Sequence, residues 1–226
     1  MWFVLFYRST IGKKIIMAAT GLIGIGFVVG HMAGNLQAFV GRDKLNAYGA
    51  LLHGPLGELL WVVRVVLVAA VVLHVLMAYQ LTMGARAARP VGYEQRRPQV
   101  STWASRTMRW GGALLLVFII LHILHFTTGQ VDPAGWRDRL DAAGRRDVYG
   151  NLVASFRIWW VAAFYVLAMI FLGLHLYHGA WSSVRTLGYA KPSPRPLHRR
   201  IALVIAAMVW LGFTVVPLAV LAGLVH

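Results

Sequence analysis

The chain has 226 residues, of which 59% are hydrophobic and only 13% are charged. Soluble domains carry about 25% charged residues, so this composition excludes a soluble globular enzyme, and its high apolar content excludes a disordered chain. The formal net charge of +15 does not indicate nucleic-acid binding, because the basic residues lie between long apolar runs, as membrane flanks do. The absence of cysteine excludes disulfides, thiolate-bound clusters and covalently attached haem.

Five apolar stretches are long enough to cross a bilayer, which takes about 20 helical residues. In chain order they cover residues 15–39, 59–83, 108–128, 159–181 and 201–224. No stretch alternates in the manner of a strand, and no linker divides the chain. The sequence therefore predicts an all-α integral membrane protein, a single five-helix bundle over residues 1–226.

The distribution of basic residues predicts how this bundle is oriented. Five spans place the two termini on opposite sides, and cytoplasmic loops carry the excess of Lys and Arg. The side with the N-terminus holds 14 cations and one acid, whereas the other side holds 8 cations and 6 acids. We therefore expect a cytoplasmic N-terminus and a C-terminus outside. The longest outer connection, 132–150, is polar and is expected to carry a short helix.

Each of the first four spans carries a histidine deep within its apolar run, and ionisable residues inside a span mark function. At about 1.5 Å of rise per residue, His31 and His122 lie in the outer half of the membrane. The same estimate places His74 and His175 in the inner half. Two layers of two imidazoles match two stacked b-type haems, each held by one histidine from either face.

The four histidines also admit two alternative roles. Each imidazole is equally able to hydrogen-bond a neighbouring helix. A proton relay in a haem-free transporter is the second, although such relays usually recruit buried acids, and the spans hold essentially none. Gly26, Gly30 and Gly34 suit either a flat cofactor or close helix packing. Arg64, near the outer end of its span, is a candidate partner for a haem propionate.

Four motifs resemble a known family. They are GHMAGN at 30–35, LHVLMAY at 73–79, the run 112–122, and LHLYHGAWS at 174–182. In this ordered set the chain resembles the dihaem cytochrome b membrane anchor of succinate dehydrogenase and fumarate reductase, of the single-chain, five-helix type. The family pattern favours His122 over His125 and His175 over His178 as ligands. His178 is then a candidate for a propionate or a quinone.

The resemblance implies two bis-histidine b haems, an outer one on His31 and His122 and an inner one on His74 and His175. It also implies an FAD-containing flavoprotein partner, an iron–sulfur subunit, and menaquinone or ubiquinone in a bacterial cytoplasmic membrane. The complex would serve the respiratory chain and the tricarboxylic acid cycle, with lipid contacts and a possible higher oligomer. The chain itself would hold no catalytic dicarboxylate site.

The quinone site is left open between two regions, each marked by three residues: Asn35, His53 and Glu58 for an outer site, or Ser9, Arg86 and His178 for an inner one. The chain departs from some relatives at Gly173, where they carry a buried glutamate that moves protons. Two other functions also remain as alternatives. One is a dihaem cytochrome b of a hydrogenase or formate dehydrogenase, and the other is a haem-free transporter.

Overall fold

A computed structural model describes residues 1–88, 91, 102–136, 138–190 and 196–226, and these contain helices and turns but no strand. The elements are, in chain order, α1 (Trp2–Arg8), α2 (Thr10–Asn35), the 3₁₀ turn η1 (Leu36–Phe39), α3 (Arg42–His53), α4 (Gly57–Ala87), α5 (Trp103–His122), the π-helical turn η2 (Ile123–Thr127), α6 (Val148–Arg157), α7 (Trp159–Thr186) and α8 (Leu197–Leu221). The all-helical prediction is therefore confirmed for the described part of the chain.

Five of these helical segments are long and apolar enough to cross a membrane: α2 with η1, α4, α5 with η2, α7 and α8. The five predicted spans are thus confirmed as helices. Most extend further than predicted at the ends that carry basic residues; α4, for example, runs to Ala87 rather than to residue 83. Backbone hydrogen bonding continues through flanking arginines, which a hydropathy count leaves out. Several residues used to predict the orientation lie outside the described residues: Arg89, Glu94, Arg96, Arg97, Arg137, Lys191 and Arg195.

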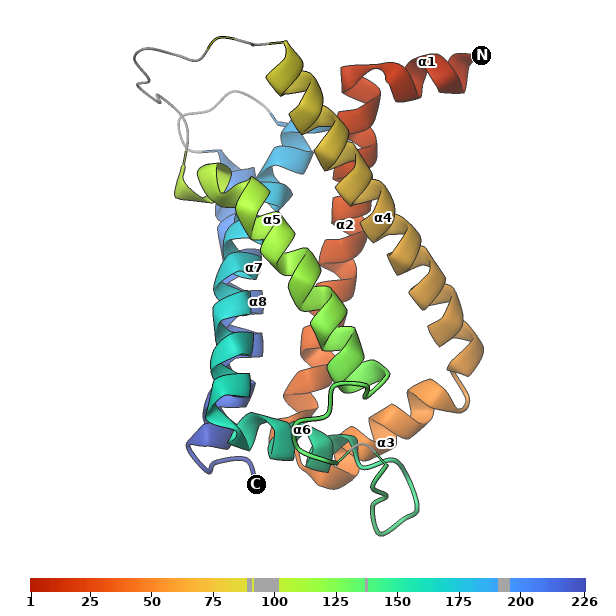
Figure 1. Cartoon of the computed structure of the whole chain (residues 1–226), viewed down its shortest axis with the longest axis vertical. Helices are drawn as coiled ribbons and strands as arrows, with labels where there is room; N and C mark the ends of the chain where they lie inside the picture. The colour runs from red at the N-terminus through yellow and green to blue at the C-terminus, as the bar shows by residue number, and fades with distance from the viewer. Residues whose placement is uncertain (89–90, 92–101, 137, 191–195) are drawn as a thin grey trace.

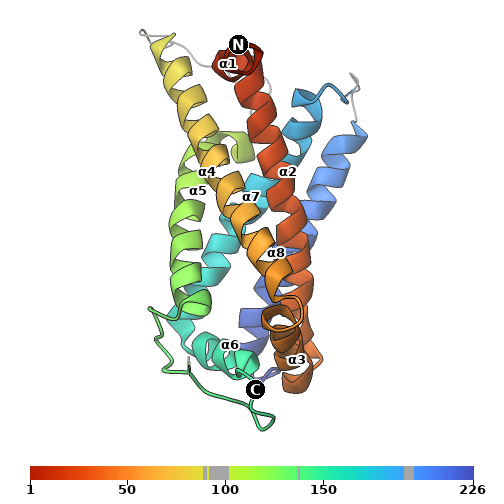
Figure 2. The same cartoon turned by 90° about the vertical axis from the view of Figure 1, so that its right-hand side faces the viewer.

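The four histidine-bearing helices form three closely packed sides of a quadrilateral. α4 packs on α2, α2 packs on α7, and α7 packs on α5, while α8 covers α7 and α2. In this order α2 and α5 face each other across one diagonal, and α4 and α7 across the other. Figures 1 and 2 show the helices running between two ends of the bundle, with the N-terminus at one end and the C-terminus at the opposite one.

The chain bends sharply between α1 and α2, so that α1 projects sideways from the end of the bundle (Figure 1). Ser9 has extended backbone here, and its hydroxyl accepts a hydrogen bond from the Gly12 amide at 2.9 Å, which caps α2. A Cβ at Gly12 would collide with the Phe6 carbonyl, so the tight turn requires glycine. Trp2 and Phe3 are exposed, as expected for a short helix lying at a membrane interface.

At the opposite end, α3, α6 and the polar connection 129–147 form a hydrogen-bonded cap. Asn46 is completely buried, and its amide donates to Asp141 at 3.1 Å and to Asp147 at 3.0 Å. The Asn46 carbonyl oxygen accepts from the Tyr149 amide at 2.9 Å. Arg145 joins Asp43 to Asp141. The short helix expected within 132–150 is α6, which begins only at Val148 and continues to Arg157.

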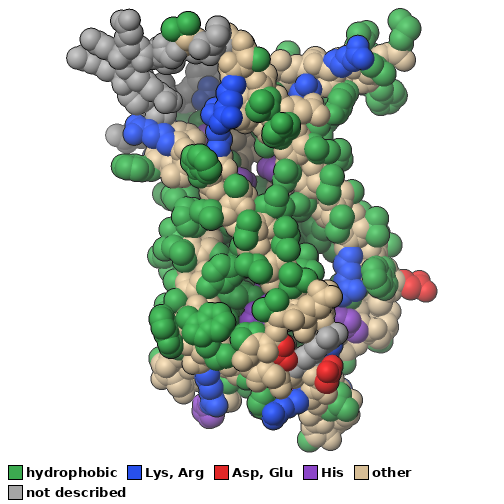
Figure 3. Space-filling model, in the orientation of Figure 1, with side chains coloured by type: hydrophobic (Ala, Val, Ile, Leu, Met, Phe, Trp, Pro, Cys, Tyr) green, Lys and Arg blue, Asp and Glu red, His purple; other side chains and the backbone are tan. Residues whose placement is uncertain are grey.

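The surface of the bundle is divided into zones. Figure 3 shows apolar side chains over the middle of the visible face, with basic side chains toward both ends. Acidic side chains appear on that face only toward the end that carries α3 and α6. This zoning is typical of a helical bundle whose middle lies in hydrocarbon, and it indicates a multi-pass membrane protein.

Candidate functional site: two histidine pairs

The first histidine pair lies across the diagonal between α2 and α5. The ring centres of His31 and His122 are 5.8 Å apart, and the ring planes are inclined by 75°. Both side chains are half-buried. Aromatic rings surround the pair: Phe27 stacks on His31 at 5.4 Å, and Phe118 stacks on His122 at 5.7 Å. Phe213 of α8 lies 5.7 Å from His31, so the setting is apolar.

The second pair lies across the other diagonal, between α4 and α7. The ring centres of His74 and His175 are 6.1 Å apart, with ring planes inclined by 55°. Glycines on the two remaining helices lie beside these rings. A Cβ added to Gly21 would lie 3.3 Å from His74 Cε1, and one added to Gly112 would lie 3.7 Å from His175 Cε1. These glycines allow the rings to approach the neighbouring backbones closely.

The two pairs lie at different heights in the bundle. His74 contacts α2 at Met17 and Thr20, and the nearer of these, Thr20, is eleven residues before His31 on the same helix. A helical rise of 1.5 Å per residue makes this about 16 Å. The pairs are therefore stacked along the bundle axis, with the His74–His175 pair nearer the end that carries the N-terminus.

The spacing within each pair fits two imidazoles bound to opposite sides of one metal ion. A metal–imidazole bond is about 2 Å long, which places the two ring centres about 6 Å apart. Within the described residues, no group of three or more His, Cys, Asp or Glu is arranged around a bare ion. A metal held by either pair would need its other ligands from a bound group, and a porphyrin supplies four nitrogens.

Hydrogen bonding leaves Nε2 of His74 available to a metal. Its Nδ1 lies 3.0 Å from the Met17 carbonyl oxygen, which can only accept, so Nδ1 must carry the proton. The Thr20 hydroxyl, 3.2 Å from the same nitrogen, donates its own proton to the Ile16 carbonyl at 2.8 Å. A neutral imidazole with a protonated Nδ1 has its lone pair on Nε2, the arrangement of a ligating histidine whose other nitrogen is held by a carbonyl.

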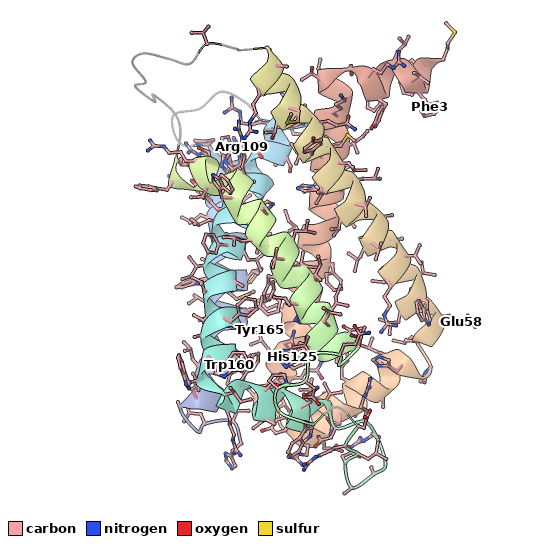
Figure 4. The ribbon with its side chains drawn as sticks, viewed as in Figure 1. Phe3, Glu58, Arg109, His125, Trp160 and Tyr165 are labelled. Carbon is pink, nitrogen blue, oxygen red and sulfur yellow. The ribbon has the colours of Figure 1, made fainter. Side chains whose placement is uncertain are left out.

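A series of hydrogen-bonded side chains likewise leaves Nε2 of His122 available to a metal. The Ser155 hydroxyl donates to the side-chain oxygen Oδ1 of Asn151 at 3.3 Å. Its oxygen therefore accepts from His125 Nε2 at 3.0 Å. Neutral His125 then accepts at Nδ1 from the Tyr165 hydroxyl, 2.9 Å away. The Tyr165 oxygen therefore accepts from His122 Nδ1, at 3.4 Å. This one-way chain leaves the lone pair of His122 on Nε2; Figure 4 shows His125 and Tyr165 side by side.

His125 itself is engaged on both ring nitrogens by protein side chains, and it is only 6% exposed. It lies in the π-helical turn η2, a local widening of the helix that is common at functional sites. With neither nitrogen free, His125 belongs to the hydrogen-bonded chain behind His122, which leaves His122 as the better placed ligand.

The remaining predicted site residues lie apart from the two pairs or beside them. Arg64 donates to His53 Nε2 at 3.5 Å and lies over the Trp61 ring, at the end of α4 next to α3. His178 lies one turn beyond His175, with its ring 5.3 Å from that of Trp181. Nδ1 of His175 and Nδ1 of His178 are both buried without a hydrogen-bond partner.

The proposed quinone regions are only partly brought together. At the α3 end, His53 lines a hollow with Gly49, Ala50, Arg145, Arg146 and Val148, which includes neither Asn35 nor Glu58. The Asn35 amide donates to the His31 carbonyl at 3.0 Å, and Ser9 is the cap of α2. Of the six quinone candidates, His53 is the one that lines this hollow.

The glycines suggested for a flat cofactor occupy different surroundings. Added Cβ atoms at Gly26 and Gly30 would meet nothing within 4 Å, whereas one at Gly34 would press on the Tyr48 ring. Gly173 faces Trp210 of α8, whose Cβ would lie 3.4 Å from an added Cβ. Two glycines lie beside the inner pair: Gly112, which begins the third motif of the sequence, and Gly21, which received no role from the sequence.

Sequence reasoning also missed Thr20, Ser155 and Tyr165. A threonine or serine in a helix can satisfy its hydroxyl on its own backbone, and a tyrosine near a span is usually an interfacial anchor. The only available signal was their polarity within apolar runs.

The fold and these pairs define the class: a multi-pass helical membrane protein with two stacked pairs of half-buried imidazoles. The chain matches no protein-family model, no curated protein sequence and no solved structure. Its more specific function therefore has to be argued from the pairs themselves.

Proposed function

We propose that this chain is the dihaem cytochrome b membrane anchor of a succinate:quinone oxidoreductase. The observation that carries the proposal is the occurrence of two imidazole pairs, with ring centres 5.8 and 6.1 Å apart, across the two diagonals of one helix bundle. Facing helices of a bundle are where cofactor sites are built, and two such sites at different heights suit electron transfer across a membrane. The order of the four histidine motifs supports the succinate dehydrogenase family specifically.

In this proposal, the chain's own residues hold and orient two haems. His31 and His122 would hold the outer one, and His74 and His175 would hold the inner one. Met17 and Tyr165 fix the ring orientations of His74 and His122 from behind. Phe27, Phe118 and Phe213 exclude water from the outer pair. Bound haem would supply one-electron redox chemistry.

The proposal extends to location and partners. The N-terminus lies in the cytoplasm of a bacterium, the C-terminus lies outside, and the basic cytoplasmic end docks an iron–sulfur subunit that in turn binds an FAD-containing flavoprotein. Menaquinone or ubiquinone exchanges electrons with the anchor. Support comes from the excess of Lys and Arg at the N-terminal end, because a basic surface attracts an acidic partner.

A reduced-minus-oxidised absorption spectrum of the purified protein tests the haem assignment. We expect the α-band of a b-type haem and two haems per chain. His74→Ala and His122→Ala should each remove one haem and leave the other, because each breaks a different pair. His53→Ala, at an exposed histidine outside both pairs, is the control and should retain two.

Absence of the α-band would contradict the haem proposal, and two haems remaining in either ligand variant would contradict the ligand assignment. Subunits that purify with the chain test the rest. FAD and iron–sulfur subunits with succinate:quinone activity would support the proposal, whereas hydrogenase or formate dehydrogenase subunits would replace it with the alternative dihaem function.

A further inference from the structure

Unsatisfied buried donors gather at the N-terminal end of the bundle, between the end of α7 and the start of α8. The Trp181 indole Nε1 and the Arg199 Nε are both buried, and neither has a hydrogen-bond partner. Both groups are obligatory donors, and a buried donor left unpaired is destabilising. Nδ1 of the neighbouring His178 is also buried and unpaired. Such a cluster indicates a missing acceptor.

The charge around the cluster is positive. The Arg199 guanidinium lies 5.0 Å from the centre of the Trp181 ring, and the Arg185 guanidinium lies 5.4 Å from it. The described acids, Asp43, Glu58, Asp132, Asp138, Asp141 and Asp147, all belong to α3, the start of α4 or the connection before α6. These segments lie at the opposite end of the bundle (Figure 1). No described carboxylate is therefore available to satisfy the two arginines.

We propose that Trp181 and Arg199, with Arg185 beside them, form a binding site for an anionic oxygen group, a carboxylate or a phosphate. An anionic acceptor would receive the indole N–H and the guanidinium N–H together, which makes charge-assisted hydrogen bonds. The His178 ring lies beside that of Trp181 and is a further polar neighbour of the proposed site. The cluster joins α7 to α8, so a bound anion would also hold the ends of these two helices together.

Two sources can bring this chemistry to the site. One is the phosphate of an anionic membrane lipid, because the cluster lies at the end of two spans, where headgroups are found. The other is a haem propionate, because His178 is one helical turn from His175; this source rests on the proposed function. The experiment separates them by using one ligand from each source.

The first arm uses the full chain, delipidated in detergent, titrated with dioleoyl phosphatidylglycerol and followed by native mass spectrometry. The second arm compares uptake of haem b with uptake of its dimethyl ester, followed by absorption. The variants are Arg199→Gln and Trp181→Phe, which remove the unpaired donors but keep most of the side-chain volume. Arg200→Gln, the exposed neighbour on α8, is the control with the same change of charge.

If the lipid is the ligand, both variants should weaken phosphatidylglycerol binding about tenfold or more relative to Arg200→Gln. If the propionate is the ligand, both should weaken binding of haem b by a similar factor but leave binding of the ester unchanged. Equal behaviour of all three variants in both arms would overturn the site. A chain that takes up no haem would refute the proposed function, and the lipid arm would then decide the anion site alone.

Discussion

At the scale of single residues, the proposed ligand role is supported by the hydrogen bonds at Nδ1 of two of the four histidines. His74 and His122 each have an acceptor at Nδ1, a backbone carbonyl in one case and a tyrosine oxygen in the other. Both arrangements leave Nε2 with its lone pair.

Tyr165→Phe tests the chain of side chains behind His122. Loss of the hydroxyl removes the acceptor of the His122 Nδ1 proton, so the ligand becomes less basic and the oxidised iron is less stabilised. We expect the midpoint potential of the outer haem to rise by about 40 mV, the equivalent of one hydrogen bond of about 1 kcal/mol. A redox titration of the α-band measures this.

Tyr149→Phe makes the same chemical change far from both pairs, where the hydroxyl donates to the His226 carbonyl at 3.1 Å, and it should leave both potentials unchanged. The inner haem should also be unaffected by Tyr165→Phe. Equal shifts of both haems, or an outer potential that does not move, would remove Tyr165 from this role.

The four candidate ligands could be predicted from the sequence, because the helical rise converts position along a span into depth in the membrane. The direction in which each histidine points from its helix could not be predicted, because the rotation of a helix about its axis depends on its packing partners. His125 and His122, three residues apart, look equivalent in the sequence. Only the π-helical turn and the contact of His125 with Ser155, 30 residues further along the chain, separate their roles.

At the scale of elements, hydropathy predicted the five spans but neither α3 nor the position of α6. A membrane span can be recognised from one continuous apolar stretch of sufficient length, so its prediction needs no distant part of the sequence. The cap at the other end is held by contacts between distant segments: Asn46 bonds to Asp147, 101 residues away. Such contacts leave no periodic pattern in the sequence, and α3 is polar enough to be taken for a loop.

Asp147 makes the stability of this cap dependent on pH. Burial opposes its ionisation, but hydrogen bonds from Asn46, the Gly150 amide and Trp136, together with Arg42, outweigh burial and lower the pKa of Asp147 below its ordinary value of 3.8. The folded state then binds fewer protons than the unfolded state. The stabilisation is fully present above pH 3.8 and is lost as the pH falls through the lowered folded-state pKa.

Asp147→Asn should therefore destabilise the protein at pH 7 by about 2 kcal/mol, the value of hydrogen bonds to a charged group. The deficit relative to wild type should shrink as the pH falls below 4. Thermal melting in detergent, followed by circular dichroism between pH 3 and 7, measures both. Glu58→Gln, at an exposed acid on α4, is the control; a deficit as large as that of Asp147→Asn would contradict the assignment.

At the scale of the whole molecule, the proposed orientation can be tested because the chain has no cysteine, so that each introduced cysteine is unique. Glu58→Cys and Tyr189→Cys place exposed thiols at opposite ends of the bundle. In spheroplasts, a membrane-impermeant maleimide should label the first directly and the second only after permeabilisation. We expect this labelling pattern because the excess of basic residues places the N-terminal end of the bundle in the cytoplasm. The reverse pattern would overturn the orientation.

The packing of α4 has a consequence for how the molecule resists heat. This helix packs on α2 toward the N-terminal end of the bundle and diverges from it toward α3 (Figure 1). It approaches α7 at His74, whose ring centre lies 6.1 Å from that of His175. Any molecule bridging His74 and His175 binds the assembled bundle and not a state in which α4 has swung away, so mass action raises the melting temperature with its free concentration. Heat resistance then becomes a measure of cofactor loading at the inner site, even in preparations too dilute for spectroscopy.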